Sequence, residues 1–89
     1  MIARRAVVSG SVQGVGFRFF AQRTAREARV TGWVRNRPDG TVETVVEGEA
    51  DAVARYLERL RSGPAGGLVA SLVLEERRIE GYSSFEITG

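Results

Sequence analysis

The chain has 89 residues, a net charge of +2 and 13 basic residues, all of them arginine. It contains no cysteine, histidine or lysine, which excludes a thiol nucleophile, a histidine base, a Schiff-base lysine and a zinc site built on Cys and His. The arginines are interleaved with 11 acidic residues, so the charge favours anionic partners only weakly.

Length and hydropathy also limit where the protein acts. A chain of this size forms one small domain with a single core, expected here over residues 1–89. No run approaches the ~20 apolar residues of a membrane span, and the start of the chain lacks the apolar segment of a signal peptide. We therefore expect a soluble cytoplasmic protein, a monomer by default, with no membrane partner.

Hydrophobic periodicity divides the chain into strands and two helices. The expected strands are Arg4–Ser9, Gly32–Arg37, Thr41–Glu47, Leu68–Leu74 and Ser84–Thr88, and the expected helices run from about Phe17 to Ala28 and from Ala50 to about Arg61. The Pro38-Asp39-Gly40 turn predicts a hairpin between the second and third strands. The apolar run Leu68–Leu74 predicts a buried strand, followed by a charged connection over Glu75–Gly81.

This order of elements predicts an α+β fold. Strand, helix, strand, strand, helix, strand, with a short last strand, is the split βαβ or ferredoxin-like arrangement. Two helices are then expected on one face of an antiparallel sheet. Because many functions use this fold, the architecture alone leaves RNA binding, regulation and catalysis open.

A glycine-punctuated loop, Gly10 to Arg18, joins the first strand to the first helix and ends on an arginine. Glycines let main-chain N–H groups approach a ligand, and a helix start adds unpaired N–H donors and the positive end of the helix dipole. Arg18 adds a planar guanidinium suited to phosphate oxygens, although it also fits a surface ion pair. The pattern is typical of an anion-binding loop, and the same glycines also fit a tight turn without a ligand.

Three other features have both a structural and a functional interpretation. Trp33 fits a ligand platform or, more commonly, core packing. The arginine-rich side of the first helix fits a solvated surface or a binding patch. Asn36 fits a hydrogen bond to its own backbone before the turn, or a role beside the loop if the central strands pair.

Two stretches resemble the signatures of the acylphosphatase family. The first is Val8–Arg18, with the sequence VSGSVQGVGFR. The second is GWVRN at Gly32–Asn36, continued by Gly40, Val42 and Gly48 at the family's spacing. The resemblance extends to Gly63-Pro64 and to Phe85–Ile87, so it covers nearly the whole chain.

The resemblance implies an enzyme that hydrolyses acyl phosphates to a carboxylate and inorganic phosphate, without a cofactor or a metal. It places the phosphate-binding arginine at Arg18 and the water-positioning asparagine at Asn36. The main-chain amides expected to surround the phosphoryl oxygens belong to Gln13, Gly14, Val15, Gly16 and Phe17. Inorganic phosphate is expected to bind as product or inhibitor.

Two residues depart from the family pattern. Ser11 stands where a basic residue is common, which lowers the positive charge expected at the mouth of the loop. Arg29 stands where a glycine often closes the first helix, which predicts a left-handed arginine at a cost of about 1 kcal/mol. Both affect affinity or stability and leave the type of reaction unchanged.

The same fold offers two other functions. A non-catalytic module that binds RNA would need aromatic residues on adjacent central strands for base stacking, and the first and third strands contain none. An acylphosphatase-like domain can also belong to a larger carbamoyl-transfer protein, for which this chain carries no extra domain. The expected partner is therefore a small acyl phosphate, without nucleic acid.

Overall fold

The computed structural model describes all residues from Met1 to Gly89. In chain order its elements are β1 (Ile2–Ser11), α1 (Phe17–Ala28), β2 (Thr31–Asn36), β3 (Val42–Gly48), α2 (Ala50–Ser62), β4 (Leu68–Arg77) and β5 (Phe85–Ile87). Each predicted element is present and in the predicted order. β1 and β4 extend further than expected, and β5 is shorter.

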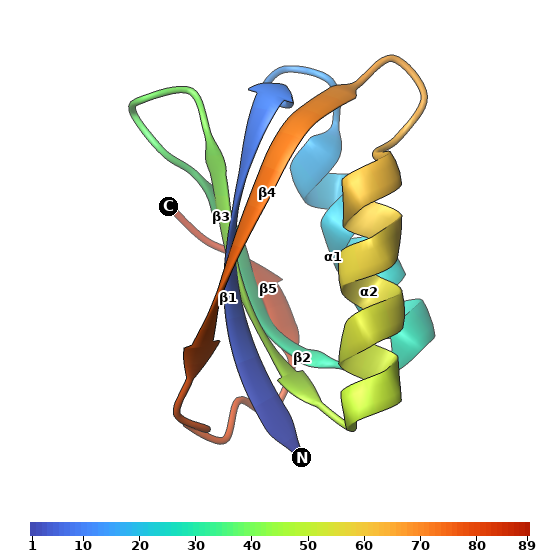
Figure 1. Cartoon of the computed structure of the whole chain (residues 1–89), viewed down its shortest axis with the longest axis vertical. Helices are drawn as coiled ribbons and strands as arrows, with labels where there is room; N and C mark the ends of the chain where they lie inside the picture. Colours follow the sequence, from blue (N-terminus) through green and yellow to red (C-terminus); the bar gives the residue numbers. More distant parts are fainter.

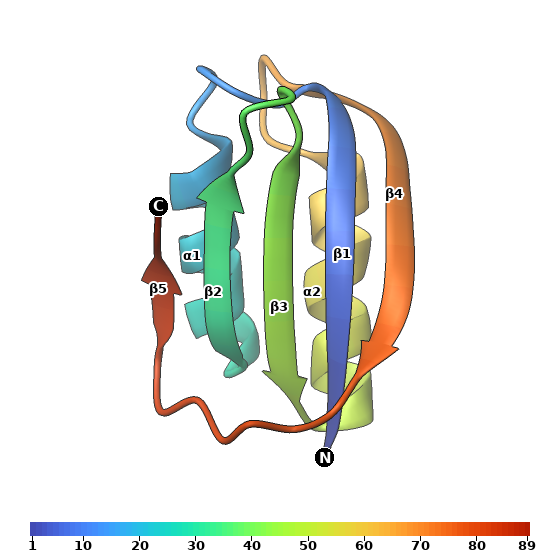
Figure 2. The ribbon, with the colours of Figure 1, turned by 90° about the vertical axis from the view of Figure 1, so that its left-hand side faces the viewer.

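The five strands form one sheet in the order β4-β1-β3-β2-β5, and both helices pack on the same face (Figures 1 and 2). β1 pairs antiparallel with β3 and β4, and β2 pairs antiparallel with β3. β5 pairs parallel with β2, so the prediction of a wholly antiparallel sheet was wrong for this strand. The reason is that the chain leaves β4 at one edge strand and runs around the end of the sheet, at the bottom of Figure 2, to reach the opposite edge.

A buried carboxylate holds this connection between β4 and β5. Glu47 is 1% exposed, and it accepts hydrogen bonds from the main-chain N–H groups of Glu80 (2.5 Å), Gly81 (3.0 Å) and Tyr82 (3.1 Å). Trp33 is half-buried beside the same connection, and its Nε1 donates to the Tyr82 hydroxyl at 3.1 Å. These bonds tie the connection to β2 and β3.

β4 is an exposed edge strand, and the prediction of a buried strand over Leu68–Leu74 was wrong. Val73 and Leu74 are 64% and 44% exposed, because β4 has a neighbour on one side only. The strand also continues to Arg77, through residues that were expected in the charged connection. Glu75 is opposite Arg5 of β1, and this pairing extends the strand past the apolar run.

The core lies between the sheet and the helices. From α1 it takes Phe17, Phe20, Ala21 and Ala25, so the first helical residue is itself anchored in the core. From α2 it takes Tyr56, which is fully buried; burial raises the pKa of its hydroxyl, which shares a 2.8 Å hydrogen bond with Thr44. Neither helix is long and apolar enough to cross a membrane.

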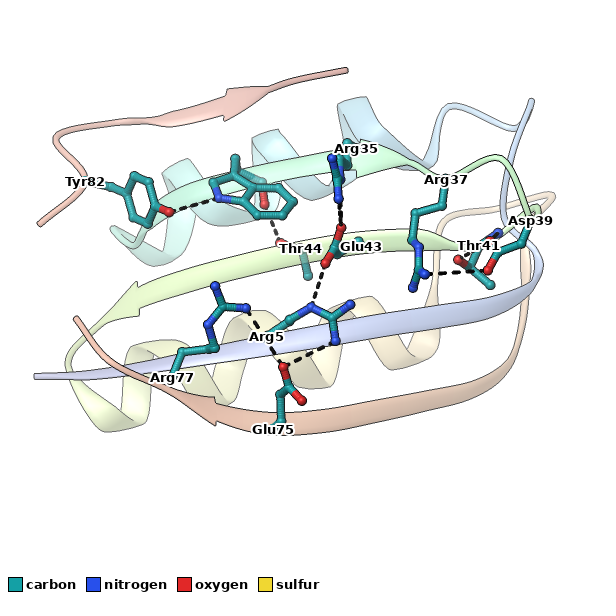
Figure 3. Close-up of polar contacts among 11 residues, drawn as sticks. Arg5, Arg35, Arg37, Asp39, Thr41, Glu43, Thr44, Glu75, Arg77 and Tyr82 are labelled. Atoms are coloured by element: carbon teal, nitrogen blue, oxygen red, sulfur yellow. Dashed lines mark hydrogen bonds and ion pairs between the residues drawn. The ribbon is translucent and has the colours of Figure 1, made fainter. Parts of the chain in front are cut away.

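The helix-free face of the sheet carries charges of alternating sign. Glu43, 5% exposed, accepts from Arg5 Nε at 2.6 Å and from Arg35 Nε at 2.7 Å (Figure 3). Arg5 also reaches Glu75 at 3.3 Å, and Arg77 lies 3.9 Å from the same carboxylate. Burial alone would raise the pKa of Glu43, but the hydrogen bonds from the two arginines outweigh it, and the pKa is lower than usual.

The two central strands hold no aromatic residue on this face. In the β1–β3 register, Arg5 lies opposite Val45 and Val7 lies opposite Glu43. RNA-binding sheets of this architecture stack bases on aromatic residues at the central strands. Neither β1 nor β3 carries such a residue.

Arg29 ends α1 in the left-handed conformation, as the sequence predicts, with φ 62° and ψ 46°. It is the only residue other than glycine with positive φ. Beyond it, the Val30 N–H donates to the Ala25 carbonyl at 3.0 Å, which closes the last helical turn. The geometry is that of a glycine C-cap, built here with an arginine.

Candidate active site

At one end of the sheet, the C-terminal ends of β1 and β2 lie on either side of β3. Both strands pair antiparallel with β3, so they run in the same direction on either side of it. In this register, Val8 and Asn36 both lie opposite Val42. The loop after β1, the turn after β2 and the loop between α2 and β4 therefore meet at one end of the molecule (Figures 1 and 2).

A pocket of about 100 Å³ lies at this end. It is lined by Val12, Gly14, Gly16, Phe17, Arg18, Phe19 and Asn36. Five of these, with Arg18 and Asn36 among them, are residues that the sequence placed at the site. Gln13 and Val15, expected there through their main-chain amides, do not line the pocket, whereas Val12 and Phe19 were not anticipated.

The loop presents a row of free main-chain donors. Gly14 and Gly16 are left-handed, with φ 77° and 76°, and a Cβ on either would meet nothing within 4 Å. Glycine is therefore required at both positions by conformation and not by space. The first bond of α1 runs from the Phe20 N–H to the Gly16 carbonyl at 3.0 Å, and no N–H between Gln13 and Phe19 donates to a protein acceptor.

Arg18 is the second residue of α1, directly after the buried Phe17. Its guanidinium forms no ion pair with any carboxylate of the chain, which removes the surface-ion-pair interpretation. No acidic residue lines the pocket, and the free N–H groups of the helix start lie in the same place. The positive end of the helix dipole adds to the charge of Arg18 there.

Asn36 is the last residue of β2. Side chains alternate along a strand, and Val34 is fully buried beneath the helices, so Asn36 faces the same layer as α1. Its Oδ1 is buried and has no hydrogen-bond partner. The interpretation of Asn36 as a local turn residue requires a bond from this oxygen to its own backbone, and no such bond is present.

The Gln13 side chain fastens the loop to the turn after β2. Its Nε2 donates to the carbonyl oxygens of Arg37 and Thr41, both at 2.8 Å. The sequence assigned only a main-chain amide to Gln13 and missed this role. The available signal was a long polar side chain in a loop made otherwise of small and apolar residues.

The turn itself is closed by a second set of hydrogen bonds. The Arg37 N–H donates to the Thr41 carbonyl at 2.9 Å, and the Gly40 N–H donates to the Arg37 carbonyl at 3.1 Å. Asp39 Oδ1 accepts from the Thr41 hydroxyl at 2.6 Å and from its N–H at 3.0 Å, as Figure 3 shows. The bond from the Thr41 hydroxyl, more than any other contact, lowers the pKa of Asp39.

A second pocket, of about 110 Å³, lies between α1 and α2. It is lined by Thr24, Glu27, Ala28, Arg55 and Arg59. Its arginines are already paired, Arg59 with Glu27 at 2.8 Å and Arg55 with Asp51 at 3.4 Å. With its cations neutralised and no row of free amides, this pocket is the weaker candidate for a functional site.

The pocket at the end of the sheet suits a small, multiply charged anion. Its donors are the free amides and Arg18, and its unpaired side-chain acceptor is the buried Asn36 oxygen, which can hold a water molecule beside the anion. No group of three or more acidic side chains is placed to hold a metal ion. The arrangement can bind a phosphoryl group and orient a water toward it.

Comparison with known proteins identifies the family. The family model described as Acylphosphatase matches residues 4–87. The acylphosphatase of Archaeoglobus fulgidus is 44% identical over 87 residues, with 98% of each chain covered. The crystal structure of the Bacillus subtilis acylphosphatase matches with a TM-score of 0.97 at 39% identity, over 100% of both chains.

A longer protein contains a similar region. The structure of full-length HypF, in its phosphate- and nucleotide-bound form, matches with a TM-score of 0.89 at 26% identity, over 99% of this chain but 12% of that one. Relatives that match this chain over nearly their whole length include the acylphosphatases of Archaeoglobus fulgidus, Bacillus licheniformis and Bacillus subtilis. The family model, these relatives and the shared fold together show that the chain belongs to the acylphosphatase family, whose members hydrolyse acyl phosphates.

Proposed function

We propose that the protein cleaves the carboxyl–phosphate anhydride of acyl phosphates by attack of an oriented water. Main-chain amides and Arg18 stabilise the phosphoryl group during this reaction. The observation that carries this mechanism is the convergence of three unsatisfied groups on one pocket. These are the free N–H groups of Gly14, Gly16 and Phe17, the unpaired Arg18 guanidinium and the orphaned Asn36 oxygen. Each of them matches one requirement of phosphoryl transfer to water.

The loop and Arg18 bind the phosphoryl group. The amides of Gln13, Gly14, Val15, Gly16 and Phe17 donate to its oxygens, and Arg18 pairs with them through its planar guanidinium. Charge on the equatorial oxygens is stabilised as the bond to the leaving carboxylate breaks. Because the groups are already in place, little reorganisation accompanies the reaction.

Asn36 positions the attacking water. Its Oδ1 accepts a hydrogen bond from the water, whose oxygen attacks phosphorus as the bond from phosphorus to the bridging oxygen breaks. The products are a carboxylate and inorganic phosphate. The chain has no histidine, lysine or cysteine, so the proton of the water passes to a phosphate oxygen of the substrate. The carboxylate is a good leaving group and needs no added acid.

The proposal also covers inhibition, domain organisation and location. Inorganic phosphate occupies the same donors as the substrate and acts as a competitive inhibitor. Residues 1–89 form one domain that acts as a cytoplasmic monomer, without cofactor, metal, membrane or nucleic acid. The donor set supports the part of this proposal that concerns metal and cofactor, since amides and arginine act on the phosphoryl group directly.

Substitution of the two side chains tests the proposal. Arg18→Ala lowers kcat/KM for benzoyl phosphate by ~10²–10³ or more, and Arg18→Lys, which keeps the charge but not the planar fork, lowers it less. Arg23→Ala, on the exposed side of α1, serves as the matched control. A near-normal turnover in Arg18→Ala, with unchanged far-UV circular dichroism, would refute the mechanism.

Asn36→Ala separates water positioning from binding. The expected result is a fall in kcat much larger than the loss of competitive inhibition by inorganic phosphate, because phosphate is bound by the loop amides and Arg18 and not by Asn36. Equal losses would make Asn36 a binding residue. A phosphate monoester serves as the negative control substrate, since its leaving group is poor.

A further inference from the structure

The pocket is enclosed on one side and apolar at its rim. Val12 and Phe17, which line its inner wall, are 1% and 2% exposed. Phe19 lines the same pocket but is 68% exposed. Phe19 therefore extends the apolar surface of the pocket from its buried wall to solvent.

The exposure of Phe19 is unusual in this chain. Among the four phenylalanines, two tyrosines and one tryptophan, it alone is exposed. The other large apolar residues exposed to solvent are Met1, Leu68, Val73, Leu74 and Ile79, and none of them lines the pocket. An aromatic ring left in water beside a binding pocket is a surface available to an apolar group.

The acyl group of a bound substrate would extend from the pocket toward this exposed ring. The loop amides and Arg18 hold the phosphoryl group in a pocket of only about 100 Å³. The acyl carbon is bonded to the bridging oxygen and therefore projects toward the rim. Phe19 follows Arg18 in the first turn of α1, so its ring lies beside that exit.

We infer that Phe19 is a specificity-determining residue and that the protein prefers acyl phosphates with apolar, above all aromatic, acyl groups. This inference rests on the proposed function. The ring offers stacking and apolar contact to an aromatic or branched acyl group, and nothing comparable to acetyl or carbamoyl groups. No carboxylate lines the pocket, and its two polar side chains, Arg18 and Asn36, already serve the phosphoryl group and the water in the proposed function.

The test measures kcat/KM for benzoyl phosphate and acetyl phosphate in the wild-type protein, Phe19→Ala and Phe19→Leu. Each substrate has its own intrinsic reactivity, which cancels when the benzoyl-to-acetyl ratio is compared between variants. Phe19→Ala is expected to lower this ratio about 3- to 10-fold, the range for one aromatic contact. Phe19→Leu, which keeps apolar contact without the ring, falls between.

Two controls accompany the measurement. Val73→Ala removes an equally exposed apolar side chain from β4, remote from the pocket, and leaves the ratio unchanged. Competitive inhibition by inorganic phosphate reports whether the phosphoryl site is intact in each variant. Because Phe19 is exposed, its replacement leaves the core in place, which far-UV circular dichroism verifies.

The outcomes are separable. A fall in the ratio with phosphate inhibition retained supports the inference. An unchanged ratio, whether both rates are unaffected or fall equally, overturns it while leaving the proposed function intact. If the wild-type protein hydrolyses neither acyl phosphate, the proposed function fails and the inference fails with it.

Discussion

Removal of the Gln13 side chain tests whether the loop and the turn work as one unit. Gln13 Nε2 donates to two carbonyl oxygens at 2.8 Å, those of Arg37 and Thr41, and these residues flank the turn that follows Asn36. Gln13→Ala deletes both bonds and keeps the main-chain amide that the proposed mechanism assigns to this residue. We expect it to lower both stability and kcat.

The size of the stability loss follows from what the carbonyl oxygens keep. The Arg37 oxygen still accepts from the Gly40 N–H, and the Thr41 oxygen still accepts from the Arg37 N–H, so no buried acceptor is orphaned. Only the net value of the two lost bonds is at stake, about 1–3 kcal/mol in all. For a domain of this size, each kcal/mol shifts Tm by about 4–8 °C.

Urea denaturation measures this loss, and Gln13→Glu is the matched control. A glutamate of the same length places a carboxylate against the same two carbonyl oxygens, where acceptor faces acceptor, and is expected to destabilise more than alanine. An alanine variant that unfolds at the wild-type midpoint with wild-type kcat would refute the bridging role.

A double-mutant cycle shows whether Gln13 acts through Asn36. If the bridge serves to hold Asn36 in place, Gln13→Ala loses most of its effect on kcat in the Asn36→Ala background. Its effect on stability persists there, because the two hydrogen bonds do not involve the Asn36 side chain. Additive effects on kcat would mean that Gln13 shapes the loop alone.

Two predictions concern stability away from the pocket. The pKa of Glu43 is held below its ordinary value of 4.5 in the folded protein, so its contribution to stability is present above pH 4.5 and is lost as pH falls through the lowered pKa. Glu43→Gln should flatten the acid limb of urea midpoint against pH, and an unchanged limb would contradict this. Arg29→Gly relieves the left-handed strain and should raise the free energy of unfolding by about 0.5–1 kcal/mol, net of the added freedom of the unfolded chain. A lower urea midpoint for Arg29→Gly would contradict that assignment.

The order of the elements was predictable because each carries its own period. The helical period of α1 is such a local pattern, and its buried residues Phe17, Phe20, Ala21 and Ala25 follow it. The environment of β4 was not predictable in this way. Leu68–Leu74 is apolar enough for a central strand. It is an edge strand because it pairs with β1 and has no neighbour on its other side. The direction of β5 depends likewise on the long connection before it.

The parts of the site that depend on residue type could be predicted from the sequence. The parts that depend on contacts between distant residues were missed. Arg18, Asn36 and the glycines could be selected from motifs, and the structure brings them to one pocket, while their roles stay predictions. The Gln13 bridge and the exposed ring of Phe19 could not be selected, because each depends on what lies across space. A side chain's partner is a property of the fold.

The topology explains how side chains from separate motifs meet. β1 and β2 are parallel but not adjacent, since β3 lies between them, and the crossover through α1 starts at the end of one and leads into the other. The start of α1 therefore lies over the end of the sheet at which β2 ends. Asn36 faces that layer only because of its register with β3, since a slip of one residue would turn it to the opposite face. The pairing of Asn36 with Val42 is thus as necessary to the site as the asparagine itself, and the Gln13 bridge fixes that pairing at its open end.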